Sequence, residues 1–300
     1  MKFPQNIMVI VSGEREQHVA LRRAVQFAKF YDIQLHLFSC VYDPGTELSP
    51  LLPSEYKETL KQNKLKQRLE YLNRLKSEIE SDNVPVTVEV KWDRRYQRAI
   101  IEACEQQKPD ILVKHISRSA TSLNPFIMPV DWQLLRQCPR PLLLVKDTEW
   151  NLEAPILAAV DASSEDPDEQ VFNQKIIDYA RSLGKLTGRP IHVITTHISP
   201  EIDNAFKMPE FNLEELREKV TRLNHDKLQS MLVDQDIASE NQHVVEGLAE
   251  DKISEIAENI NAQIVVMGTL GRRGIQGALM GNTAEKVLTQ LRCEVLALRP

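Results

Sequence analysis

Two stretches of the chain, KPDILVKH at residues 108–115 and NAQIVVMG at residues 261–268, are built on the same plan. Each has a short polar start followed by an apolar run, which is typical of a strand buried on both faces of a parallel sheet. His115 aligns with Gly268, 153 residues later, and the same offset superimposes the last apolar run of each half. Because the chain has 300 residues, this offset indicates that its second half repeats its first.

Apolar runs and segments of helical periodicity alternate along both halves. Strands are expected at residues 6–12, 33–42, 84–92, 110–115 and 141–147, and again at 156–160, 191–198, 243–247, 262–268 and 294–298. Helices are expected at residues 18–31, 55–81, 96–107 and 130–137, and again at 172–186, 213–232, 250–260 and 282–291. Such alternation favours parallel sheets with right-handed crossovers. The sequence therefore predicts an α/β protein of two tandem doubly wound domains, each with a mainly parallel five-stranded sheet.

The domain boundaries follow from the repeat. We expect the first domain to span residues 1–147 and the second to span residues 156–300, with residues 148–155 as the linker. The alternative is a single large α/β domain. The matching register of the two halves argues against it.

The composition is that of a globular protein, with 42% hydrophobic and 27% charged residues. No apolar run approaches the ~20 residues of a membrane span, and the first residues lack the pattern of a signal peptide. We therefore expect a cytoplasmic location and no membrane contact. The first 150 residues hold 22 Lys and Arg against 19 Asp and Glu, whereas the last 150 hold 15 against 24. This balance disfavours nucleic acid as a partner, because sequence-independent binding needs a basic face.

Cysteine and histidine show no spacing typical of a metal site. The closest two histidines along the chain are His192 and His197, and both fall in an expected strand. Reduced and mostly buried thiols are expected for the cysteines, which are Cys40, Cys104, Cys138 and Cys293. No motif indicates a nucleophile or a general base. The sequence therefore predicts neither a metal site nor a catalytic residue.

Five of the ten glycines fall in MGTLGRRGIQGALMGNT, residues 267–283, between an expected strand and an expected helix. In an open parallel sheet, ligands bind outside the carboxyl ends of the strands. The free N–H groups at a helix start attract anions, and glycine lets phosphate oxygens approach the main chain. The stretch therefore predicts a phosphate-binding loop, in which Arg272 and Arg273 either add positive charge or are solvated.

The spacing of this loop is specific: Gly268-x-x-Gly271, nine further residues, and then Gly281-Asn282-Thr283. It resembles the ATP-binding signature of the universal stress protein family. Asn282 departs from the family pattern, in which Ser or Thr is commoner. The resemblance covers nearly the whole chain in element order and repeat length, and it implies the adenine nucleotide alpha hydrolase-like fold of that family.

The resemblance implies a site for ATP or ADP, with Mg²⁺, in the second domain. In nucleotide-binding members, an Asp that ends the first strand holds the adenosine and the glycine loop holds the phosphates, and the matching Asp here is Asp161. From the residues alone, Asp161 reads either as an acceptor for hydroxyl and amino groups or as a helix N-cap or loop residue. The implied site consists of Val160, Asp161, Ala162, Met267, Gly268, Gly271, Gly281, Asn282 and Thr283.

The first domain has lost these features. Residues with side chains replace the glycines of the phosphate-binding loop, and one matching position is a proline, which lacks an N–H donor. We therefore expect no nucleotide in the first domain. The residues that match Asp161, Gly268, Gly271 and Gly281-Asn282-Thr283 are, in order, Ser12, His115, Arg118 and Met128-Pro129-Val130.

The family resemblance implies a cytoplasmic stress-response protein that binds an adenine nucleotide, supports survival under stress or damage, and is not an enzyme. Family domains join through their last strands, which implies a pseudo-dimer within the chain through residues 141–147 and 294–298, and it leaves room for homo-oligomers. Two alternatives stay open. One is a nucleotide-independent scaffold or carrier of a small apolar ligand, with a groove framed by the helices at residues 55–81 and 213–232. The other is an ATP-using enzyme.

Overall fold

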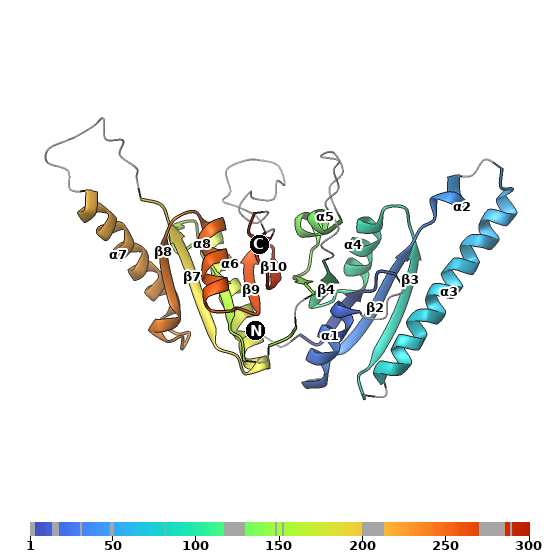
Figure 1. Ribbon diagram of the computed structural model, residues 1–300, viewed down its shortest axis with the longest axis horizontal. Helices are drawn as coiled ribbons and strands as arrows, with labels where there is room; N and C mark the ends of the chain where they lie inside the picture. The colour runs from blue at the N-terminus through green and yellow to red at the C-terminus, as the bar shows by residue number, and fades with distance from the viewer. Residues whose placement is uncertain are drawn as a thin grey trace. The chain divides into compact units, whose positions relative to one another are not determined.

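The computed structural model divides the chain into two units (Figure 1). One unit is residues 3–147, and the other is residues 148–300 together with residues 1 and 2. The structure describes residues 4–13, 18–30, 32–48, 51–80, 82–116, 130–147, 149–151, 153–199, 213–269, 286–288 and 290–300. Over these ranges, every helix is too short or too polar to cross a membrane.

The described part of the first unit contains a parallel sheet with the strand order β3-β2-β1-β4-β5. Its strands are β1 (Asn6–Ile10), β2 (Gln34–Val41), β3 (Val86–Trp92), β4 (Ile111–His115) and β5 (Leu142–Val145). Its helices are α1 (Val19–Phe30), α2 (Pro44–Leu48), α3 (Ser54–Glu80), α4 (Tyr96–Gln107) and α5 (Val130–Gln137). Buried apolar side chains of β1, β2, β4 and β5 form the core of this unit.

The second unit repeats this sheet, with the strand order β10-β9-β6-β7-β8. Its strands are β6 (Ile156–Ala159), β7 (Ile191–His197), β8 (Gln242–Glu246), β9 (Ile264–Gly268) and β10 (Glu294–Leu298). Its helices are α6 (Pro167–Thr187), α7 (Leu213–Leu232) and α8 (Ala249–Asn259), with a short 3₁₀ turn, η1 (Ser239–Asn241). Residues 286–288 and 290 are also helical.

Strand order decides which face each helix covers. From β6 to β8 the chain steps toward one edge of its sheet, and from β8 it crosses back to β9 and β10. Right-handed crossovers then place α6 and α7 on one face and α8 on the other. Helices α3 and α7 run beside the outer strands β3 and β8 (Figure 1). The predicted fold class, tandem doubly wound α/β domains with parallel sheets, is confirmed.

Helix α6 begins earlier than its apolar periodicity predicts, at Pro167 rather than at residue 172. Asp166 is its N-cap, and the carboxylate accepts a hydrogen bond of 2.9 Å from the N–H of Asp168. Pro167 occupies the first helical position, where no N–H is needed. The first turn is polar, so the apolar pattern alone does not reveal it.

Gly188 ends α6 in the left-handed region, with φ = 67°, and its N–H bonds to the carbonyl of Gly184. A Cβ built on Gly188 would have no heavy atom within 4 Å outside its chain neighbours. Conformation rather than space therefore selects glycine here.

Substitution of Gly188 tests this cap. Gly188→Ala is expected to lower the free energy of unfolding of the second unit by about 1 kcal/mol, because alanine is strained at this φ. Gly188→Asn should lower it by less, since asparagine tolerates the left-handed region better. Urea denaturation followed by circular dichroism measures both. Equal losses for the two variants would contradict a purely conformational role.

Candidate functional site

Five of the nine predicted site residues are described by the structure, and they lie at the carboxyl ends of β6 and β9. These strands are parallel neighbours, and Ala158 lies opposite Val266. Two residues further along each strand, Val160 and Gly268 therefore stand at the same level. The sheet thus brings Val160, Asp161 and Ala162 beside Met267 and Gly268. The other predicted residues, Gly271, Gly281, Asn282 and Thr283, lie outside the described residues.

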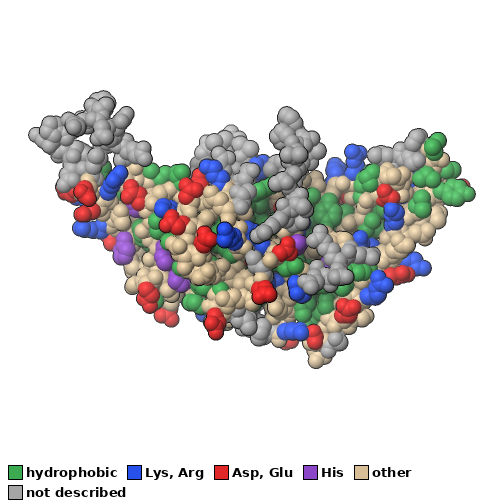
Figure 2. Space-filling model, viewed as in Figure 1, with side chains coloured by type: hydrophobic (Ala, Val, Ile, Leu, Met, Phe, Trp, Pro, Cys, Tyr) green, Lys and Arg blue, Asp and Glu red, His purple; other side chains and the backbone are tan. Residues whose placement is uncertain are grey.

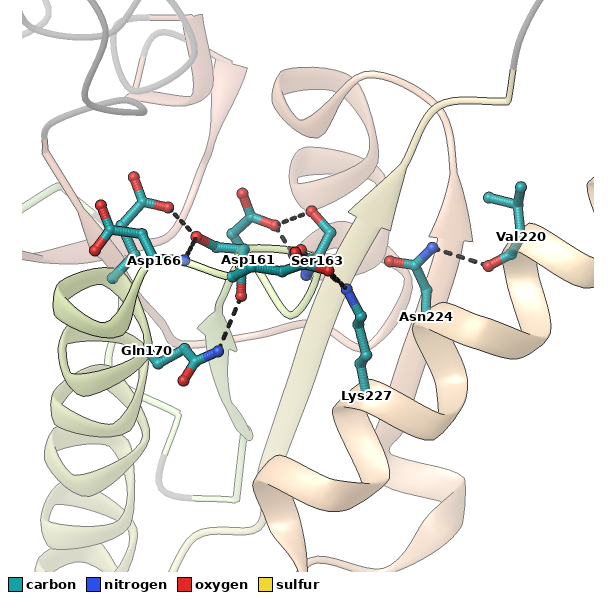
Figure 3. A network of polar contacts seen from close by, with 10 residues as sticks. Asp161, Ser163, Asp166, Gln170, Val220, Asn224 and Lys227 are labelled. Carbon is teal, nitrogen blue, oxygen red and sulfur yellow. Dashed lines mark hydrogen bonds and ion pairs between the residues drawn. The ribbon is translucent and has the colours of Figure 1, made fainter.

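Asp161 is the first residue of a tight turn that follows β6. Its Oδ1 atom accepts hydrogen bonds from the main-chain N–H of Ser163 at 3.1 Å and from the Ser163 hydroxyl at 2.5 Å. Figure 3 shows both side chains facing each other across the turn. A bond from an aspartate to the backbone two residues later is an Asx turn. The carboxylate is thus held in one place at the edge where ligands bind in parallel sheets.

Asn173 of α6 fixes the main chain of the same turn. The N–H of Asp161 donates to Asn173 Oδ1 at 3.0 Å, and Asn173 Nδ2 donates to the carbonyl of Asp161 at 2.8 Å. The Asn173 side chain is buried, with 4% of the residue exposed. The two bonds also set the orientation of the amide, because the main-chain N–H can only donate and the carbonyl can only accept.

The turn is tied to β7 as well. The N–H of Val160 donates to the carbonyl of Ile194 at 3.0 Å, and the N–H of Ala162 donates to Thr195 Oγ1 at 3.1 Å. The side chains of Val160, Ala162 and Met267 are buried. These three residues can therefore present only main-chain atoms to a ligand.

Gly268 has a structural role that its sequence pattern does not reveal. A Cβ at this position would lie 2.7 Å from Cε1 of Phe172, closer than any real contact. A side chain at the end of β9 would therefore need the half-buried Phe172 ring to move, so glycine suits the packing here whatever binds nearby. Directly after it, the N–H of Thr269 donates to the carbonyl of Leu298 at 2.9 Å, which fixes the start of the glycine stretch against β10.

Two lysines near this edge were not predicted. Lys227 of α7 donates from Nζ to the carbonyl of Ser163 at 3.2 Å and lies 3.3 Å from Glu165 Oε1 (Figure 3). Lys175 of α6 donates to the carbonyl of Arg299 at 2.8 Å, and burial lowers its pKa. No local motif marks either residue, since each contact joins segments that are far apart in the sequence.

At the equivalent corner of the first unit, side chains bond to one another. The Ser12 hydroxyl, at the position of Asp161, bonds to the hydroxyl of Tyr96 at 2.9 Å. Burial raises the pKa of Tyr96 to about 12. His115, at the position of Gly268, bonds through Nε2 to Asp147 Oδ1 at 2.8 Å.

The remaining loop equivalents of the first unit are only partly described. Arg118, Met128 and Pro129 lie outside the described residues, and Val130 is the first residue of α5. Residues 117–129, which match the glycine stretch, thus lie outside the described part of the chain.

In the described parts of both units, no three or more His, Cys, Asp or Glu side chains gather as a metal site would. In the described residues, none of the four cysteines forms a disulfide. Cys104 and Cys138 are buried, and the neighbouring Cys138 thiol together with burial raises the pKa of Cys104. These thiols are poor nucleophiles, because thiolate is the reactive form.

Removal of the Asn173 amide tests the support of the turn. Asn173→Ala removes one partner from the N–H and one from the carbonyl of Asp161, which keeps only a longer bond of 3.4 Å from the N–H of Ser164. We expect the free energy of unfolding to fall by about 2 kcal/mol. Gln174→Ala is the matched control, because Gln174 makes a bond to Asp178 within the same helix. Its loss should be about 0.5 kcal/mol or less. Similar losses for the two variants in urea denaturation would show that the Asn173 tie is unimportant.

The universal stress protein family matches the chain twice, at residues 4–146 and 154–299. The chain is 30% identical over 305 residues to a universal stress protein E homolog of Haemophilus influenzae, and it covers 98% of that protein. It is 29% identical over 301 residues to universal stress protein E of Escherichia coli strain K12 and covers 95% of it. Both alignments span 100% of this chain.

Solved structures show the same fold over the whole chain. A protein of unknown function from Pseudomonas aeruginosa PAO1 is 25% identical, with a TM-score of 0.75, and the match covers 99% of this chain and 93% of that one. A putative universal stress protein from Pseudomonas aeruginosa UCBPP-PA14 is 26% identical, with a TM-score of 0.74, and the match covers 99% and 94%. The chain therefore belongs to the universal stress protein family, of which it carries two domains in tandem.

Proposed function

We propose that the second unit binds ATP or a related adenine nucleotide, and that the protein serves the stress response as a binding protein rather than as an enzyme. The observation that carries the proposal is the fixed Asp161 turn beside Gly268, at the carboxyl ends of β6 and β9. Ligands of parallel α/β sheets bind at this edge. The glycine spacing that begins at Gly268 is the ATP-binding pattern of the family.

Each part of the site has its own task in this proposal. Asp161 accepts hydrogen bonds from the adenosine, as the matching Asp does in family members. The residues from Gly268 to Thr283 offer main-chain N–H groups to the phosphates, which glycine leaves accessible. Mg²⁺ accompanies the nucleotide, because it is held mainly by phosphate oxygens and water. Asn173 and Lys227 position the turn and do not contact the ligand in this scheme.

We place one nucleotide site in the chain and none in the first unit. Support comes from Tyr96 and His115, whose side chains stand at the carboxyl ends of the first sheet. Ser12 cannot replace Asp161 as a charged acceptor, and its hydroxyl already bonds to Tyr96. Cytoplasmic location and pairing of residues 141–147 with 294–298 stay predictions from the resemblance.

A fluorescent ATP analogue tests the site. Wild-type protein should bind one equivalent, and Asp161→Ala and Gly281→Val should each weaken binding about tenfold or more, which corresponds to about 1.4 kcal/mol. Ser12→Ala is the matched control in the first unit, and it should bind like the wild type. The assignment fails if wild type does not bind or if all four proteins bind alike.

The same proteins separate binding from catalysis. Phosphate release by the wild type should be no faster than release by Gly281→Val, since no general base or nucleophile is part of the proposal. Faster release by the wild type would favour an ATP-using enzyme. An apolar molecule extracted from the purified protein, in place of a nucleotide, would favour a carrier.

A further inference from the structure

Two histidines of the second unit touch across neighbouring strands. His192 lies on β7 and His243 lies on β8, and Nδ1 of His192 is 3.0 Å from Nε2 of His243. The ring planes are within 9° of parallel, and the ring centroids are 5.3 Å apart. Figure 2 shows histidine side chains at the molecular surface over the part of the unit that contains these strands.

The register of the strands explains the contact. Ile194 lies opposite His243, and His192 points to the same face as Ile194 because side chains alternate along a strand. His197 points to the other face, where it meets Thr221 of α7 at 3.2 Å. The pair therefore lies on the face opposite α7, on the outer strand β8 and its neighbour. Both side chains are half-buried, so solvent can reach them.

The hydrogen bond leaves one of the two facing nitrogens with a lone pair. One ring donates an N–H to the lone pair of the other, so at least one facing nitrogen is unprotonated. Burial lowers the pKa of both histidines, and the nearby His243 ring lowers that of His192 further. Neutral imidazole is the ligand form of histidine, and it suits zinc, nickel and copper ions.

We propose that His192 and His243 together bind one divalent transition-metal ion, such as Zn²⁺. With metal–nitrogen distances of about 2.0–2.1 Å, two ligands of one ion lie roughly 3.0–3.4 Å apart. The observed 3.0 Å between the facing nitrogens already meets this requirement. The ring proton between them moves to the other nitrogen of its own ring, and both rings tilt so that their lone pairs point at the ion. Water completes the coordination, so the site is open on one side.

The first unit provides an internal comparison. His36 lies opposite Met8 in its sheet as His192 lies opposite Leu157, and Glu89 takes the place of His243. His36 bonds to Thr87 Oγ1 at 2.8 Å and to Glu89 Oε2 at 3.1 Å, and only 8% of it is exposed. Both ring nitrogens are thus engaged and shielded. We therefore expect one metal site per chain.

The site is separate from the proposed nucleotide site. His192 and His243 are each the second residue of their strand, near the amino ends, whereas Asp161 follows the carboxyl end of β6. Metal binding by this pair does not depend on whether the second unit binds a nucleotide.

Calorimetric titration with zinc chloride tests the proposal on the full chain. Wild-type protein should bind one equivalent, and His192→Asn and His243→Asn should each bind about tenfold or more weakly. His225→Asn is the matched control, because His225 is an exposed histidine of α7 outside the pair. It should bind like the wild type. The proposal is overturned if the wild type binds no zinc, or if all three variants bind as the wild type does.

A second measurement needs no variant and covers the case in which a substitution impairs folding. In histidine ring NMR spectra of the wild type, one equivalent of zinc should shift the signals of His192 and His243 and leave those of His36 and His225 in place. Shifts confined to other histidines would place the metal elsewhere and refute the pair. Zinc should also raise the unfolding temperature of the wild type, because it binds only the folded pair.

Discussion

The two hydrogen bonds between the Asn173 amide and the main chain of Asp161 are the constraint on which the site depends. They hold the turn that follows β6 against α6, and the bond from the Ala162 N–H to Thr195 holds the same turn against β7. Any arrangement that breaks these bonds leaves the buried Asn173 amide unsatisfied, which favours the observed turn. The Asp161 carboxylate therefore stands at a fixed point before any ligand arrives, so binding need not order it.

The two units show how one scaffold carries different chemistry. Strand order and register are the same in both sheets, but the side chains at matching positions differ. After the first strand Ser12 replaces Asp161, and its hydroxyl bonds to that of Tyr96. At the outer strands, Glu89 bonds to His36 in one unit, whereas His243 bonds to His192 in the other. Fold is thus set by the apolar core, and function by a few residues at its edges.

The sequence predicts the fold well because the core is periodic. Helix α7 and strand β10 have the predicted bounds. The start of α6 was missed because its first turn is polar and is held by the cap at Asp166. The sequence did not predict three sets of hydrogen bonds: those of Asn173, that of Lys227, and that between His192 and His243. Asn173 lies 12 residues from Asp161, and the other two contacts join residues 51 or more apart. Strand register or helix packing brings each pair together, and no local motif marks it.

Backbone amide hydrogen exchange, measured by mass spectrometry with and without ATP and Mg²⁺, tests the central claim most directly. Phosphates held by main-chain N–H groups must slow the exchange of those groups. The account predicts slower exchange in residues 268–283 and at the Asp161 turn, with no change in residues 115–130 of the first unit. Unchanged exchange in residues 268–283, or equal slowing in both units, would contradict it.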